Sequence, residues 1–132
     1  YAISLLQDSL NEKALPIRGT KITILGVAYK KNVDDPRESP FFEIRKKLEE
    51  KGADLRIYDS WISTENTVNN IEEALKDSKA ILIVTDHDNS IKELNELNLK
   101  ESSVEVIIDG RNCLDSKKMQ TQGIIYRGIG RR

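Results

Sequence analysis

Four short runs of apolar, mostly β-branched residues recur along the chain and constrain its fold more than any other feature. Such continuous runs suit strands that are buried on both faces, because half-exposed strands alternate apolar and polar residues. The runs occupy residues 22–29, 55–59, 80–85 and 104–108. Segments with helical spacing lie between them, and repeated strand–helix–strand units imply right-handed crossovers. We therefore predict an α/β fold: a three-layer, Rossmann-like open sheet, mostly parallel, with helices on both faces.

The best-marked helix is predicted after the first strand and its loop. Ser39 can cap its amino end, Pro40 suits its first position, and Gly52 can end it. Apolar residues recur between them at helical spacing. The other expected elements are helices over 71–76 and 89–97 and an edge strand within 123–128.

The first 18 residues differ from the rest of the chain. Residues 2–10 have the pattern of the end of an amphipathic helix, and residues 16–19 resemble a joint. We divide the chain into this helix end and joint (1–18) and one domain (19–132), because 132 residues are too few for two domains. The chain starts at Tyr1 rather than Met, so we expect it to be a piece of a longer protein.

Charge and composition exclude several classes of function. The net charge is −1, so no overall basic field would attract nucleic acid or anionic lipid. No apolar run approaches the roughly 18–20 residues of a membrane span. The single cysteine, Cys113, excludes an internal disulfide and a cysteine-based zinc cluster. We expect a cytoplasmic protein without a metal site.

Polar side chains follow the predicted strands at the edge where open α/β sheets bind ligands. Lys30 and Arg111 would supply a point charge and a planar, two-pronged donor, a combination that suits phosphate. Tyr29 could pack against a base or a sugar. The alternative is that Tyr29 lies in the core, Lys30 is solvated, and Arg111 pairs with Asp86 or Asp109.

Two other nucleotide or phosphate folds fit the sequence poorly. A dinucleotide site needs three glycines in its first turn, and only Gly26 is present. Asp59 stands where an acid would bind a ribose, but the loop before the helix is too long. A phospho-receiver domain needs an acceptor aspartate after the third strand, whereas Asp59 follows the second, and its required lysine is missing.

Five motifs in order resemble the C-terminal, UDP-binding domain of the UDP-glucose/GDP-mannose dehydrogenase family. The resemblance is strongest to the branch that oxidises UDP-N-acetyl-hexosamines. The leading helix resembles the end of the long helix that joins the two halves of these enzymes. The motifs are GVAYKKNVDDPRESP, KGADLRIYDS, ILIVTDHD, VIIDGRNCLD and YRGIG.

The resemblance implies a role in the NAD-dependent oxidation of a sugar C6 hydroxyl to a carboxylate, such as UDP-N-acetylmannosamine to its uronic acid. In the family the N-terminal half brings the NAD fingerprint, and that half together with the central region brings the nucleophilic cysteine. This sequence contains neither, so no residue here is expected to be catalytic. Tyr29 and Lys30 match the pair that lines the uridine diphosphate site, and Arg111 matches an arginine that reaches the substrate.

Arg37 matches an arginine that contacts NAD across the cleft between the two halves. The alternative is a salt bridge with Glu38 or Asp35 that orders the loop. By resemblance the partners are UDP or a UDP-N-acetyl-hexosamine, the missing NAD-binding half and, at full length, further copies of the same chain. The competing functions are a freestanding regulatory nucleotide-binding module and an architectural or dimerisation domain.

Four other residues or pairs could be given a functional role, but a structural role is favoured for each of them. Cys113 lacks an activating base, so we interpret it as a packed small hydrophobe. His87 could shape the sugar end of the pocket, but a hydrogen-bonded loop histidine is favoured. Trp61 is interpreted as a lid over the core or a contact between domains, and Asp34-Asp35 before Pro36 as a solvated turn.

Overall fold

The computed structural model describes residues 2–99 and 102–129. These residues form a five-stranded sheet in the order β2-β1-β3-β4-β5, in which every neighbouring pair is parallel. The predicted fold class is confirmed, and the expected edge strand is β5. In chain order the elements are α1 (Ala2–Glu12), β1 (Lys21–Leu25), α2 (Phe41–Glu50), β2 (Asp54–Tyr58), α3 (Ile71–Leu75), β3 (Ala80–Ile83), α4 (Asp88–Glu96), β4 (Val106–Asp109), α5 (Ser116–Thr121) and β5 (Ile125–Gly128).

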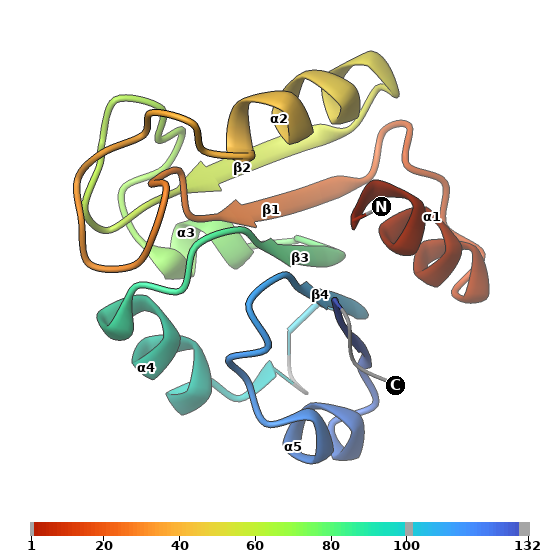
Figure 1. Cartoon of the computed structure of the whole chain (residues 1–132). Coiled ribbons are helices and arrows are strands. Elements are labelled where there is room, and N and C mark those ends of the chain that lie inside the picture. Colours follow the sequence, from red (N-terminus) through yellow and green to blue (C-terminus); the bar gives the residue numbers. More distant parts are fainter. Residues whose placement is uncertain (1, 100–101, 130–132) are drawn as a thin grey trace.

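The sheet is covered on both faces by helices that belong to two separate apolar clusters (Figure 1). Alternate strand residues point to opposite faces, so Ile24 and Leu82 pack with α1 and α2. Ile81 and Ile83 pack on the other face with α3, α4 and α5. This arrangement explains why the strand sequences are apolar throughout rather than alternating.

The capping signals of α2 act within one residue of the predicted positions: Pro40 is the N-cap and the helix begins at Phe41, one residue later than expected. The Ser39 hydroxyl accepts a hydrogen bond from the Phe41 backbone N–H (3.2 Å), and Pro40 has helical dihedral angles. Gly52 follows the helix with φ +84°, a conformation that glycine adopts without steric cost. The helix therefore starts and stops where the local chemistry dictates.

The leading helix packs into the same core as the sheet. Leu6 and Leu10 of α1 are fully buried in the cluster that also contains strand residues of β1, β3 and β4. The division of the chain at residue 18 stays a prediction. None of the helices within residues 2–99 and 102–129 has both the length and the apolar character needed to cross a bilayer.

Three local expectations differ from the structure. The first strand ends at Leu25 rather than at residue 29, because Gly26 turns the chain with φ +100°. The third strand likewise ends at Ile83. Helix α5 was not expected, although Asp115 caps it by accepting bonds from the Lys117 and Lys118 N–H groups.

Candidate functional site at the carboxyl edge of the sheet

The loops that follow β1, β2, β3 and β4 meet at the carboxyl edge of the sheet (Figure 1). Gly26 brings the first of them close to the third. A Cβ atom at Gly26 would lie only 2.4 Å from the backbone nitrogen and the Cβ of Thr85, so no other residue fits without a shift. The Thr85 hydroxyl then donates to the Ala28 carbonyl at 2.5 Å. The glycine therefore serves close packing of two loops.

Asp59 connects three of these loops through its carboxylate. Its Oδ2 accepts hydrogen bonds from the backbone N–H groups of Val27 (2.6 Å) and Ala28 (3.0 Å) after β1. Its Oδ1 accepts from those of Trp61 (2.7 Å) and Ile62 (2.9 Å) after β2. Since the side chain is buried and bonded to protein groups, it is not available to bind a ribose.

The pKa of Asp59 reflects this surrounding. Burial by itself raises the pKa of the carboxyl group, but hydrogen bonds from His87 and from the N–H groups of Val27, Ala28 and Trp61 outweigh burial. The net result is a pKa well below the ordinary value of an aspartate. Asp59 therefore stays ionised in the folded protein and holds the loops with charge-assisted bonds.

His87 joins Asp59 to the loop after β1. The ring is buried, and its Nε2 lies 2.9 Å from Asp59 Oδ2. Its Nδ1 accepts a hydrogen bond from the Asn32 backbone N–H at 2.8 Å. The interpretation of His87 as a hydrogen-bonded loop histidine is confirmed, with partners that lie 28 and 55 residues away in the sequence.

Arg111 holds two loops by their backbone. Its Nε donates to the Val84 carbonyl (2.9 Å) and its Nη2 to the Tyr29 carbonyl (3.0 Å). The side chain therefore does not make the alternative pairing with Asp86 or Asp109. A guanidinium has five N–H donors, and these two bonds use two of them, so others remain for a ligand.

The remaining candidate residues at this edge face outward. The Tyr29 side chain is 47% exposed, so its alternative placement in the core is wrong. Lys30 is exposed beside it. The structure thus brings Tyr29, Lys30 and Arg111 to one edge through the contact between Arg111 and the Tyr29 carbonyl. Whether they bind a ligand stays a prediction.

Arg37 lies farther along the same loop and forms the ion pair that the alternative interpretation describes. Its Nε and Nη2 donate to the two oxygens of Asp35 at 3.0 and 2.8 Å. The hydrogen bond from the Arg37 side chain lowers the pKa of Asp35 to about 2. Both groups are exposed, so the pair orders the loop without a large contribution to stability.

Cys113 has the surroundings of a structural thiol. It packs at the margin of the cluster beneath α5, and its Sγ lies 3.4 Å from Asp109 Oδ1. Burial and then the nearby Asp109 carboxylate raise the pKa of the thiol above its ordinary value. A nucleophilic cysteine needs the opposite shift, so this geometry agrees with the packing interpretation.

Trp61 covers the histidine. Its indole ring stacks on the His87 ring with centroids 5.9 Å apart and an angle of 25° between the planes. The outer face leaves the side chain 47% exposed. Trp61 therefore covers the buried histidine, while a lid over the core and a contact between domains stay predictions.

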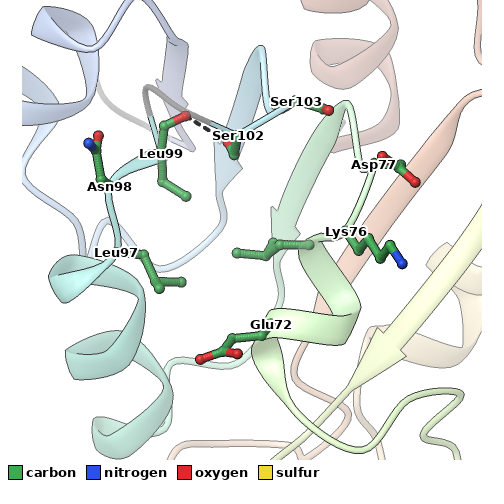
Figure 2. Close-up of a pocket in the computed structure, with 9 residues that line it drawn as sticks. Glu72, Lys76, Asp77, Leu97, Asn98, Leu99, Ser102 and Ser103 are labelled. Atoms are coloured by element: carbon green, nitrogen blue, oxygen red, sulfur yellow. Dashed lines mark hydrogen bonds between the residues drawn. The ribbon is translucent and has the colours of Figure 1, made fainter.

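Among the cavities bordered by the described residues, two lie at opposite ends of the sheet. One of about 320 Å³ borders Arg111, Val84 and the start of α2 at the carboxyl edge. Another of about 430 Å³ lies near the amino ends of β3 and β4, between α3 and the segment after α4. Figure 2 shows Leu97, Leu99 and Lys76 around the second cavity, which contains none of the candidate residues. We therefore locate the candidate site at the carboxyl edge.

Sequence reasoning missed the buried connections of this site. From the sequence, Asp59 is weighed only as a ribose ligand or a phosphate acceptor, and Asn32 is not considered. The one available signal was the cluster of polar residues at successive strand ends, which predicts proximity but not partners. Within the described residues, no group of three His, Cys, Asp or Glu side chains is arranged to hold a metal ion.

The parallel sheet, its two helical layers and the polar residues gathered at its carboxyl edge define a Rossmann-like α/β domain of the ligand-binding type. Residues 23–116 match the UDP-binding domain of the UDP-glucose/GDP-mannose dehydrogenase family. The chain belongs to this family, as its motifs predict.

Relatives and solved structures agree with this assignment. The chain is 34% identical over 125 residues to the UDP-glucose 6-dehydrogenase TuaD of Bacillus subtilis, covering 87% of this chain and 27% of the relative. It is 33% identical over 132 residues to the UDP-N-acetyl-D-mannosamine dehydrogenase of Pyrococcus horikoshii, covering 99% and 30%. The NDP-N-acetyl-D-galactosaminuronic acid dehydrogenase of Methanosarcina mazei superposes with a TM-score of 0.86 at 28% identity, covering 99% and 29%. The chain thus spans less than a third of each protein.

Proposed function

We propose that this chain forms the UDP-sugar side of an NAD-dependent UDP-N-acetyl-hexosamine 6-dehydrogenase, with UDP-N-acetylmannosamine as the substrate. The family match over residues 23–116 carries the proposal. The similarity to the UDP-N-acetyl-D-mannosamine dehydrogenase of Pyrococcus horikoshii supports the choice of sugar. We place the enzyme in the cytoplasm and expect the full-length protein to be a homo-oligomer.

Each of the three candidate residues would make a different kind of contact with the ligand. Lys30 offers a mobile point charge for a phosphate, and Arg111 offers fixed N–H donors, because two carbonyl groups hold its guanidinium. The exposed ring of Tyr29 provides an apolar surface for the base or the ribose. The small cavity beside Arg111 gives room for part of the ligand next to these groups.

The residues described here do not fit NAD at their first strand turn. Gly26 is packed against Thr85, and residues 26–40 separate β1 from α2. A pyrophosphate bound in the usual way needs a helix that starts directly at a glycine-rich turn. We therefore assign NAD and the cysteine nucleophile to the rest of the enzyme, and we expect this chain alone to catalyse nothing. Arg37 is our candidate for a contact with the cofactor from this side.

Calorimetric titration of UDP into the chain and its variants tests the proposal. We expect Lys30→Ala to weaken binding by about tenfold, the loss of one charge-assisted hydrogen bond. Lys31→Ala is the matched control, since this neighbouring lysine pairs with Asp88 at 3.6 Å. Arg111→Lys keeps the charge but loses the planar fork, so it should also weaken binding. Equal affinity of the parent and Lys30→Ala would refute the assignment of Lys30.

A further inference from the structure

The loop that carries Tyr29 and Lys30 is held by two side chains, Arg111 from the loop after β4 and His87 from the loop after β3. On one side, Arg111 donates to the Tyr29 carbonyl at 3.0 Å. On the other, the Asn32 backbone N–H donates to His87 Nδ1 at 2.8 Å. Lys30 lies between these two bonds. The position of its side chain therefore depends on both contacts, although neither contact involves Lys30 itself.

The hydrogen bonds around His87 define its proton arrangement. Because Nδ1 accepts from the Asn32 N–H, Nδ1 carries no proton, and the neutral ring has its proton on Nε2. Nε2 then donates to Asp59 Oδ2 at 2.9 Å. Protonation of Nδ1 would place two N–H groups against each other and break the bond to the loop. Asn32 has φ +58°, so the loop adopts a conformation that needs support from its surroundings.

We propose that His87 is a positioning residue for the ligand site: its neutral, Nε2-protonated ring holds the Tyr29–Asn32 segment through the Asn32 N–H and thereby places Lys30 for the diphosphate. This inference rests on the proposed function for its ligand. Four charged groups lie near the His87 ring. Asp59 contacts Nε2, and Asp86 and Asp88 are the neighbours of His87 in the chain. Lys31 pairs with Asp88. Trp61 covers the ring from outside without a charge of its own.

Two substitutions separate the two bonds of the ring. His87→Asn places an amide oxygen near the position of Nδ1, so it can still accept from the Asn32 N–H but cannot reach Asp59. His87→Gln places an amide nitrogen near the position of Nε2, so it can still donate to Asp59 but offers the loop no acceptor. Urea unfolding of both variants measures the structural loss separately from the ligand affinity.

Binding of UDP-N-acetylglucosamine provides the first measurement. We expect His87→Gln to bind about fivefold more weakly than the parent, the scale of one net hydrogen bond, and His87→Asn to bind within about twofold. The Asn32 amide should exchange with solvent faster only in His87→Gln. Equal losses of affinity in the two variants, or parental affinity in His87→Gln, would overturn the proposal.

Nuclear magnetic resonance of the parent chain provides a measurement that does not depend on folded variants. The sequence contains a single histidine, so one pair of ring nitrogen signals reports on His87 alone. We expect the Nε2–H tautomer, because Nδ1 accepts from the Asn32 N–H and Nε2 lies against Asp59 Oδ2.

The outcomes distinguish this inference from the proposed function. A ring found as the Nδ1–H tautomer overturns the positioning role alone. Failure of the parent to bind both UDP and UDP-N-acetylglucosamine overturns the proposed function and the ligand placement together. The expected tautomer, together with weaker binding by His87→Gln and near-parental binding by His87→Asn, supports the proposal.

Discussion

Two buried carboxylates at the carboxyl edge, Asp59 after β2 and Asp109 at the end of β4, organise their surroundings in different ways. Asp59 accepts bonds from loops after three strands, including the loop with Val27 and Ala28. Asp109 accepts mainly from its own turn, through the N–H groups of Arg111, Cys113 and Leu114 at 2.8–3.0 Å. Its bond outside this turn comes from the Tyr126 hydroxyl of β5 at 2.5 Å.

This difference shows how one residue type can connect a site or shape a single turn. Removal of the Asp59 charge should loosen the contact between loops that are far apart in sequence. Removal of the Asp109 charge should mainly disturb the turn that presents Arg111. Both carboxylates are buried, so the comparison concerns connectivity rather than solvent exposure.

Asp59→Asn should have the largest effect on stability. The amide nitrogen must face either the two donors at Oδ1 or the three at Oδ2, so N–H groups are left opposed whichever way it turns. We expect a loss of about 3–5 kcal/mol in the free energy of unfolding, measured in urea. Asp109→Asn is the isosteric control and should lose less, because its turn can open to water. Equal losses would remove the distinction between the two carboxylates.

The acid stability of the parent should depend on Asp59. Its folded-state pKa lies below the unfolded-state value of about 4, so its bonds stabilise the fold above that pH. This stabilisation is lost progressively as the pH falls below about 4. The stability of Asp59→Asn should fall less steeply over the same range in urea titrations. Parallel pH profiles for the parent and the variant would contradict the low pKa of Asp59.

Tyr126→Phe should have a smaller effect on stability, and this effect should be confined to the surroundings of Asp109. It removes one donor from a carboxylate that keeps its backbone bonds, so we expect a loss of about 1–2 kcal/mol in urea unfolding. Tyr58→Phe, on the opposite edge strand β2 and partly exposed, is the matched control and should change stability less. Affinity for UDP should stay near the parental value, and a large loss of affinity would show that β5 supports the site.

Asp35→Asn should have the smallest effect on stability. The carboxyl group is exposed and pairs with Arg37, so the midpoint of unfolding should stay close to that of the parent. In the parent, the carboxyl carbon signal of Asp35 should titrate near pH 2. A titration near the ordinary value would mean that the pair does not persist in solution, and Arg37 would then be free to move.

The sequence predicted the layers of the fold because they follow from local patterns. The apolar runs, Ser39, Pro40 and Gly52 all act through neighbours in the chain. Helix α5 escaped prediction because it is short, even though Asp115 and Gly123 mark its ends. The resemblance to a known family identified Tyr29, Lys30 and Arg111 as candidates.

The buried network could not be predicted in the same way. In the sheet order β2-β1-β3, strand β1 separates the strands that lead to Asp59 and His87, so the pairing of these two residues depends on how the loop after β1 turns. The conformation of the loop after β1 depends on Gly26 and its contact with Thr85. Motifs place such residues at one edge, but only the folded backbone decides which donor meets which acceptor.

The two outermost strands have a consequence for the behaviour of the chain in concentrated solution. Both strands lie at a margin of the sheet, where a strand from another molecule could pair, but part of their outer backbone is already bonded within the chain. The Ile57 carbonyl of β2 accepts from the Thr67 N–H at 2.9 Å, and the Tyr126 carbonyl of β5 accepts from Arg127 at 3.2 Å. Arg56 pairs with Asp54 on β2 at 2.6 Å, and Arg127 of β5 reaches Glu12 of α1 at 3.3 Å. Charged side chains at both margins oppose edge-to-edge association, so the domain is protected against forming aggregates of continuous sheet.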